Sequence, residues 1–262
     1  MIGRFLLGLV LASASCATLA GDRNAGNVMF VSMAFEAHGE APARICEQPC
    51  RMWVTGAGPI TERTPQDFKL FADKHNLRGA TLVLDSEGGS VVGAIELGRA
   101  VRSLEMTTTV GKAVQTRQAD GTIATTFTPR ASCQSMCVFL MLAGSQRYVA
   151  PEARLLVHQI WLTDKTKGSK THSYTADELA LVERDIGKLV RYTIEMGGDA
   201  ELIEAALQVP PWEALRRLSS DEIQRMKLST ADDFFTGRGA AVAQSPRPAP
   251  VASSSQLSGK AQ

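Results

Sequence analysis

The chain has 262 residues, of which 44% are hydrophobic and 21% are charged, and its formal net charge at pH 7 is +1. This composition is that of a globular protein with enough apolar residues for a sizeable core. The near-neutral charge argues against a general nucleic-acid-binding protein, which would carry an excess of basic residues.

The first twenty residues have the pattern of a secretory signal peptide. Arg4 precedes an apolar run at 5–12, and small residues follow as far as Ala20; this order of charged, apolar and small-residue regions is typical of an export signal. We therefore expect 1–20 to be removed and the mature protein to be periplasmic. No later segment is long and apolar enough to anchor the chain after cleavage. Lipidation at Cys16 is the alternative, but the residues before it lack the usual large aliphatic side chain.

The mature chain alternates strand-like and helix-like segments, which predicts an α/β fold. We expect strands at 26–35, 51–56, 80–84, 106–114 and 154–161, a hairpin within 118–127, and helices at 66–75, 91–103, 175–196, 199–208 and 219–226. Local signals support the helix starts: Thr64 as the cap of the first, and two capping boxes, Thr175 with Glu178 and Ser219 with Glu222.

No linker or repeat divides the chain, so one domain over about 25–236 is expected. Residues 237–262 are rich in Ala, Pro and Ser and almost without large apolar side chains. Such a segment cannot bury enough apolar surface to fold, so we predict a disordered tail.

The segment 132–144 is the most informative stretch. It begins with small polar residues and continues as an apolar run rich in helix formers, which is typical of a helix buried on all sides. Ser135 would lie near its first turn, where free N–H groups and the helix dipole favour a developing anion. Its hydroxyl is then either a nucleophile or a helix cap.

A glycine pair, Gly88 and Gly89, lies between the strand at 80–84 and the helix at 91–103. Paired glycines let backbone N–H groups approach a ligand closely, although most such pairs form plain turns. The pattern does not match G-x-G-x-x-G, and a Walker lysine is absent, which disfavours nucleotide binding.

One histidine stands out. His158 follows the apolar run Leu155-Leu156-Val157 in the strand predicted at 154–161, a position that is typical of a core histidine. The other histidines are expected in loops or at the surface and are not catalytic candidates: His38, His75 and His172.

The four cysteines of the mature chain form two pairs with the same C-x3-C spacing. Exported proteins in oxidising compartments tend to pair their thiols, so we expect Cys46–Cys50 and Cys133–Cys137, although four cysteines allow three connectivities. A zinc site is a disfavoured alternative because the tight C-x2-C spacing is absent and histidines are few. Free thiols on either side of Ser135 are a third alternative. We therefore predict no metal and no cofactor.

Three motifs occur in order along the chain: Asp85-Ser86-Glu87-Gly88-Gly89-Ser90, Cys133-Gln134-Ser135-Met136, and the stretch from Tyr148 to Gln159. This set resembles the proteolytic subunit of Clp protease and the wider Clp/crotonase superfamily, in particular its exported branch. The resemblance covers about 50–230. It implies a spiral core of repeated ββα units with long helices C-terminal to the core, and a homo-oligomer by analogy.

The resemblance also implies a serine hydrolase site. Ser135 would be the nucleophile and His158 the general base that takes its proton. The Gly88-Gly89 turn and Met136 would supply N–H donors to the oxyanion.

This sequence departs from the superfamily pattern at the acid of the site. The acid position of the superfamily falls near Pro211, so Glu213 is the nearest carboxylate and Asp221 the next. Without an orienting carboxylate the histidine can adopt the wrong tautomer, which costs about ten-thousand-fold in a serine protease.

Three functions stay open at this point. The first is an exported serine hydrolase, with a peptide or protein as the expected substrate. The second is a catalytically silent Clp-like binding or scaffold protein of the periplasm, which a missing acid favours. The third is a crotonase-like enzyme acting on a thioester, which export disfavours because acyl-CoA is cytoplasmic.

Overall fold

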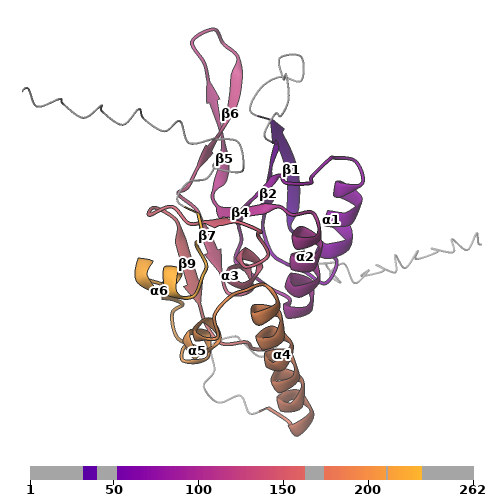
Figure 1. Ribbon diagram of the computed structural model, residues 1–262, viewed down its shortest axis with the longest axis vertical. Coiled ribbons are helices and arrows are strands. Elements are labelled where there is room, and N and C mark those ends of the chain that lie inside the picture. Colours follow the sequence, from indigo (N-terminus) through magenta and orange to yellow (C-terminus); the bar gives the residue numbers. More distant parts are fainter. Residues whose placement is uncertain (1–31, 40–51, 163–173, 211, 232–262) are drawn as a thin grey trace, which may run out of the picture. The chain divides into compact units, whose positions relative to one another are not determined.

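Two sheets and a separate hairpin carry the fold (Figure 1). The computed structural model describes residues 32–39, 52–162, 174–210 and 212–231, which belong to one compact unit. The α/β class expected from the sequence is confirmed. Several predictions concern positions outside the described residues: the signal peptide at 1–20, Cys16, the Cys46–Cys50 pair, His172, Pro211 and the tail at 237–262.

The larger sheet has five strands in the order β1-β2-β3-β4-β8. Its strands are β1 (Ala34–Gly39), β2 (Met52–Ala57), β3 (Thr81–Asp85), β4 (Thr107–Val110) and β8 (Arg147–Tyr148). Only the pair of β1 and β2 is antiparallel, and the other neighbours are parallel. Parallel strands are joined by crossovers that bury both faces, which explains the continuous apolar run of β3.

The smaller sheet has the order β10-β9-β7, with β9 parallel to β7 and antiparallel to β10. Its strands are β7 (Ser132–Gln134), β9 (Arg154–Val157) and β10 (Arg216–Arg217). A single bridge between Ser86 and Cys133 connects the end of β3 to β7. The smaller sheet therefore continues from the carboxyl end of the larger one.

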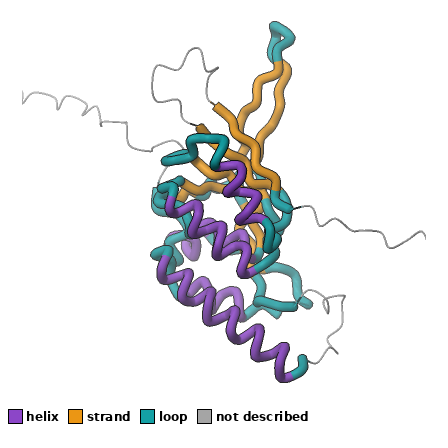
Figure 2. Tube along the Cα trace, turned by 90° about the vertical axis from the view of Figure 1, so that its right-hand side faces the viewer, coloured by secondary structure: helices purple, strands orange, loops and turns teal. Residues whose placement is uncertain are grey.

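Most of the described helices lie on one side of the strands (Figure 1, Figure 2). The helices are α1 (Thr64–Ala72), α2 (Val91–Ser103), α3 (Met136–Met141), α4 (Ala176–Glu195), α5 (Glu201–Leu207) and α6 (Ser220–Arg225). Along β3, Leu82 and Leu84 belong to the main core with the helices, whereas Val83 packs with Trp53 on the opposite face. This alternation is the period of two that a strand imposes. Within the described ranges, no helix combines the length and apolar character needed to cross a membrane.

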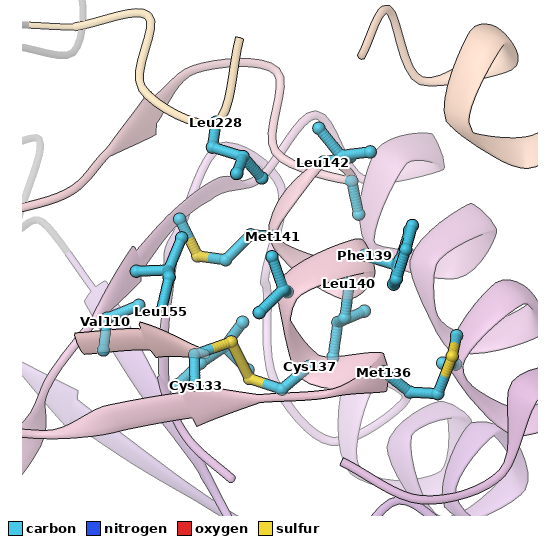
Figure 3. Close-up of a cluster of buried hydrophobic side chains, with 14 of the residues drawn as sticks. Val110, Cys133, Met136, Cys137, Phe139, Leu140, Met141, Leu142, Leu155 and Leu228 are labelled. Carbon is cyan, nitrogen blue, oxygen red and sulfur yellow. A yellow bond between two sulfur atoms is a disulfide. The ribbon is translucent and has the colours of Figure 1, made fainter. Parts of the chain in front are cut away.

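Helix α3 lies at the centre of the main core (Figure 3). All six of its residues are buried, and side chains from distant parts of the chain surround it, including Val110, Leu155 and Leu228. The prediction of a helix buried on all sides is confirmed. Since every face of α3 is packed, the residue that precedes it is held by a rigid support.

The local predictions hold best where short-range signals decide. Helix α2 begins and ends where expected, with Ser90 as its cap, and the capping boxes of α4 and α6 are both formed. The hairpin is confirmed as well, although it is longer than expected, with strands β5 (Lys112–Arg117) and β6 (Ile123–Thr128). The predicted strand 106–114 is broken at Gly111, against which the ring of Phe127 packs.

The start of α1 differs from the prediction. Thr64 is the first helical residue and not the cap, because its hydroxyl accepts a hydrogen bond from the upstream N–H of Thr61 at 2.8 Å. Leu70 lies within this helix but is 52% exposed, whereas Phe68 is buried. Residues two apart on a helix do not share a face, so Leu70 cannot be buried together with Phe68.

The first strand also differs from the prediction. It was expected at 26–35, of which 26–31 lie outside the described residues; the described strand is Ala34–Gly39, which extends beyond the expected end and includes His38. His38 is therefore not in a loop: it stacks on Trp53 of β2, with ring centroids 4.2 Å apart, and its Nε2 lies 3.3 Å from the hydroxyl of Thr55. Pairing with β2 thus decides the position of this strand.

Candidate active site

Ser135 occupies a sharp turn between β7 and α3. Its backbone angles are φ 52° and ψ −122°, a region that residues other than glycine rarely adopt. Such a conformation costs on the order of 1–3 kcal/mol and persists only when the surroundings impose it. Its side chain makes no capping hydrogen bond to α3. The alternative that this hydroxyl serves as a helix cap is therefore wrong.

The backbone of Ser135 is attached to the strand that leads to His158. Strand β7 is parallel to β9 with Gln134 opposite Leu156, and the N–H of Ser135 donates to the carbonyl of Leu156 at 2.8 Å. His158 lies two residues beyond Leu156, immediately after the end of β9. Neighbouring strands are about 4.8 Å apart, so the two residues lie at adjacent strand ends.

The glycine turn lies directly against Ser135. Gly88 is buried and has φ +91°, and a Cβ atom on it would lie 2.6 Å from the carbonyl oxygen of Gln134, 2.8 Å from the N of Met136 and 2.9 Å from the Cβ of Ser135. Only glycine allows this approach. The structure therefore brings together the glycine turn, Ser135 and Met136.

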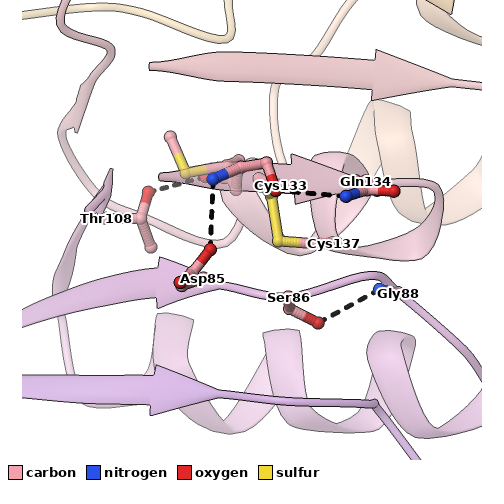
Figure 4. The surroundings of a disulfide bond; sticks show 9 residues. Asp85, Ser86, Gly88, Thr108, Cys133, Gln134 and Cys137 are labelled. Carbon is pink, nitrogen blue, oxygen red and sulfur yellow. Dashed lines mark hydrogen bonds between the residues drawn. A yellow bond between two sulfur atoms is a disulfide. The ribbon is translucent and has the colours of Figure 1, made fainter. Parts of the chain in front are cut away.

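Asp85 and Ser86 hold the turn in this position (Figure 4). Ser86 exchanges backbone hydrogen bonds with β7: its N–H donates to Ser132 at 3.0 Å, and its carbonyl accepts from Gln134 at 2.9 Å. The carboxylate of Asp85 accepts a hydrogen bond from the N–H of Ser132 at 3.1 Å. Sequence analysis assigned no role to Asp85 and Ser86; their position between a buried strand and a glycine pair is the signal that could have indicated one.

The three expected oxyanion donors are not equivalent. The N–H of Gly88 donates to the hydroxyl of Ser86 at 3.1 Å, so it is already engaged. In the described part of the chain no acceptor is found for the N–H of Gly89. Met136 is the first residue of α3, where the N–H has no partner within the helix. The geometry therefore favours Gly89 and Met136 as the donors.

His158 is half-buried, and burial lowers the pKa of its imidazole below the ordinary value of 6.5. The neutral imidazole, which can accept a proton, is therefore the dominant form at pH 7. Among the described residues, His158 has no hydrogen bond or ion pair with a carboxylate, and no carboxylate contributes to its pKa.

The segment expected to supply the acid does run beside His158. The N–H of Gln159 donates to the carbonyl of Val209 at 3.0 Å, and Arg216 of β10 pairs with Val157. Among the described residues, neither candidate carboxylate forms a hydrogen bond or ion pair with His158: Glu213 is exposed, and Asp221 is exposed in the first turn of α6. The described structure thus brings the backbone of this segment to the site without bringing either carboxylate into contact with the imidazole.

Cys133 and Cys137 form a disulfide on either side of Ser135 (Figure 4). Their Sγ atoms are 2.01 Å apart, their Cα atoms are 5.2 Å apart, and both residues are fully buried. This is one of the two pairings expected from the sequence. Among the described residues, no group of three or more His, Cys, Asp or Glu is placed to hold a metal ion.

Two cavities in the described part of the chain lie near other elements, although Asp85 is shared between the first of them and this site. One of about 200 Å³ lies between the larger sheet and the base of the hairpin, where Glu36, Asp85 and Lys112 contribute to its wall. The other, of about 640 Å³, is an open groove along α5 with Val190, Ile203 and Leu207 in its wall. Neither is lined by Ser135 or His158.

No family model matches the sequence, and no curated protein is significantly similar to it.

Proposed function

We propose that this protein is an exported serine hydrolase of the Clp-like type, with peptides or proteins as substrates. The observation that carries this proposal is the conformation of Ser135. Ser135 is a partly exposed serine in an unfavourable backbone conformation, directly before a buried helix and against a glycine turn, and strained conformations of this kind cluster at active sites.

The proposed mechanism uses Ser135 as the nucleophile and His158 as the base. The hydroxyl attacks the substrate carbonyl while the imidazole takes its proton, and the imidazolium then returns the proton to the leaving group. The N–H groups of Gly89 and Met136 stabilise the oxyanion, and each such donor is typically worth about a hundred- to a thousand-fold in rate. With no carboxylate bound to His158 in the described residues, this site works as a serine-histidine pair.

The proposal extends to the fold and to the cellular location. The motif order and the mixed α/β architecture support a Clp/crotonase-like spiral core, which in that superfamily assembles into oligomers. The signal-like sequence at 1–20 supports export to the periplasm, and a buried disulfide agrees with an oxidising compartment.

A second candidate function is a catalytically silent Clp-like binding or scaffold protein. One observation favours it: the imidazole of His158 lacks the carboxylate partner that orients the base in most serine hydrolases. A silent relative would keep the fold and the turn while losing reactivity at Ser135.

Labelling with a fluorophosphonate probe distinguishes the two. We expect the exported full-length chain to be labelled at Ser135, as located by peptide mass spectrometry, and Ser135→Ala to lose the label. Ser103→Ala is the matched control, because Ser103 is an exposed serine at the end of α2. A folded wild-type protein that reacts no faster than Ser135→Ala would exclude the hydrolase and leave the binding protein. Hydrolysis of a fluorescent peptide library, lost in Ser135→Ala, would test the peptidase assignment.

A further inference from the structure

The disulfide spans the turn that contains Ser135. Cys133 is the middle residue of β7, Cys137 is in the first turn of α3, and Ser135 lies midway between them. The bond therefore joins the incoming strand to the outgoing helix on either side of the candidate nucleophile. Because both cysteines are fully buried, the bond is part of the core that supports the turn.

Apart from the disulfide, the turn at Ser135 has more restraints on its strand side than on its helix side. On the strand side, Ser135 donates to Leu156 and Gly88 packs against it. On the helix side, α3 has only six residues and no side-chain cap, and the turn is closed by the hydrogen bond from the N–H of Val138 to the carbonyl of Ser135 at 3.0 Å. The buried side chains of α3 hold the helix itself in place, but they do not fix the backbone angles of Ser135, which precedes its first residue.

We propose that the Cys133–Cys137 disulfide is a positioning device for Ser135, so that the reactivity of this serine requires the oxidised protein. This inference rests on the proposed hydrolase function. The unfavourable backbone conformation of Ser135 needs surroundings that impose it, and the disulfide is the restraint on the helix side that does not depend on a single hydrogen bond. A displacement of about 1 Å at a reacting group can cost about a hundred-fold in rate.

Loss of the bond is a two-electron reduction. A dithiol such as dithiothreitol supplies two electrons and two protons, Cys133 and Cys137 become free thiols, and the dithiol closes into its own cyclic disulfide. Strand β7 and the first turn of α3 are then no longer linked across the turn, and Ser135 can relax to a negative φ. Since both sulfur-bearing residues are buried, reduction requires long incubation or brief unfolding followed by refolding.

The test compares the rate of fluorophosphonate labelling at Ser135 in four proteins. These are the oxidised wild type, the reduced wild type, Cys133→Ala/Cys137→Ala, and Cys46→Ser/Cys50→Ser. We expect labelling to fall about a hundred-fold in the reduced wild type and in the Cys133→Ala/Cys137→Ala protein, while Cys46→Ser/Cys50→Ser keeps the wild-type rate and stays sensitive to dithiothreitol. Reoxidation should restore labelling of the reduced wild type and of the reduced Cys46→Ser/Cys50→Ser protein, but not of Cys133→Ala/Cys137→Ala.

The folded fraction is measured in each sample by circular dichroism and thermal unfolding, and rates are compared per folded molecule. A disulfide that only stabilises the fold would lower the melting temperature and leave this rate unchanged, which would overturn the proposal. If the double alanine protein does not fold, the partly reduced wild type gives the same comparison. Absence of labelling in the oxidised wild type is a different result, since it would refute the hydrolase function itself.

Discussion

Gly88 and Ser135 are in such close contact that a methyl group on the Cα of Gly88 would lie 2.9 Å from the Cβ of Ser135. The contact joins a turn after β3 to a turn before α3, two parts of the chain that meet through the bridge between Ser86 and Cys133. Real Cβ atoms essentially never approach other heavy atoms this closely. The position of Ser135 therefore depends on Gly88, a residue that lacks a side chain and lies in the turn between β3 and α2.

Gly88→Ala should abolish most of the reactivity of Ser135. The added methyl group overlaps the backbone on both sides of the serine, so the turn must move, and overpacking typically costs about 1–3 kcal/mol in stability. We expect labelling by a fluorophosphonate to fall at least about ten-fold, beyond the effect on the folded fraction.

Gly79→Ala is the matched control for this change. Gly79 also has a positive φ, +71°, but a Cβ atom there would have no neighbour within 4 Å. It should show the backbone cost of alanine, about 1–2 kcal/mol, with unchanged labelling per folded molecule. Equal rates in the two variants would show that the Gly88 contact does not position the serine.

The reactivity of Ser135 should persist to mildly acidic pH. Burial lowers the pKa of His158 below 6.5, so the neutral base is retained below the pH at which an ordinary histidine is half protonated. The acidic limb of the labelling rate against pH should therefore have its midpoint below 6.5. A midpoint at or above 6.5 would argue that a negative charge, absent from the described surroundings, acts on the imidazole.

The free energy of unfolding should also depend on pH through His158. Because the pKa of His158 is lower in the folded protein than in the unfolded chain, the unfolded state binds more protons in the window below 6.5. Stability therefore falls as the pH drops from 6.5 toward the folded pKa and then levels off. His38, whose pKa is also lowered by burial, acts in the same direction. Urea unfolding of His158→Asn against wild type, from pH 7 to 5, should show a smaller loss in the variant.

Replacing the two candidate acids should have little effect on labelling. Glu213 and Asp221 are both exposed and have no contact with His158 in the described structure. We expect Glu213→Gln and Asp221→Asn each to change the labelling rate by less than about ten-fold. Loss of a true triad acid costs about ten-thousand-fold, so a fall of that size in either variant would identify the acid and show that the side chain moves to the imidazole.

The contributions of the buried Arg147 and the partly buried Arg102 to stability should depend on each other. Arg102 and Arg147 both donate to the carbonyls of Leu142 and Met196, at 2.8 to 3.1 Å. These carbonyls lie at the C-terminal ends of α3 and α4, where positive charge is favourable. Burial, together with the charge of Arg102, lowers the pKa of Arg147 to about 10.

Each single substitution, Arg102→Met or Arg147→Met, leaves one donor for the shared carbonyls. The double substitution leaves them without either arginine, and an unsatisfied buried acceptor costs about 1–3 kcal/mol. In a urea-unfolding cycle we therefore expect the double variant to lose more than the sum of the single losses, by about 1 kcal/mol. Strict additivity would show that the two arginines bind independently.

The sequence by itself determined those features that depend on neighbours a few residues away. The capping boxes at Thr175 and Ser219, the bounds of α2 and the buried character of α3 were all predictable. Caps and amphipathic periodicity act within one or two turns of a helix, so a local pattern is sufficient. The candidates Ser135 and His158 were also found from local motifs, although their roles are still predictions.

Only the tertiary structure decided what these residues contact. The end of β9 before His158 follows from pairing with β7 and β10, and the lowered pKa of His158 follows from packing around it. The hydroxyl of Ser86 accepts a hydrogen bond from the N–H of Gly88. The side chains of Glu213 and Asp221 are exposed. These outcomes depend on strand register, burial and side-chain direction between segments far apart in the chain, and no local pattern specifies such contacts.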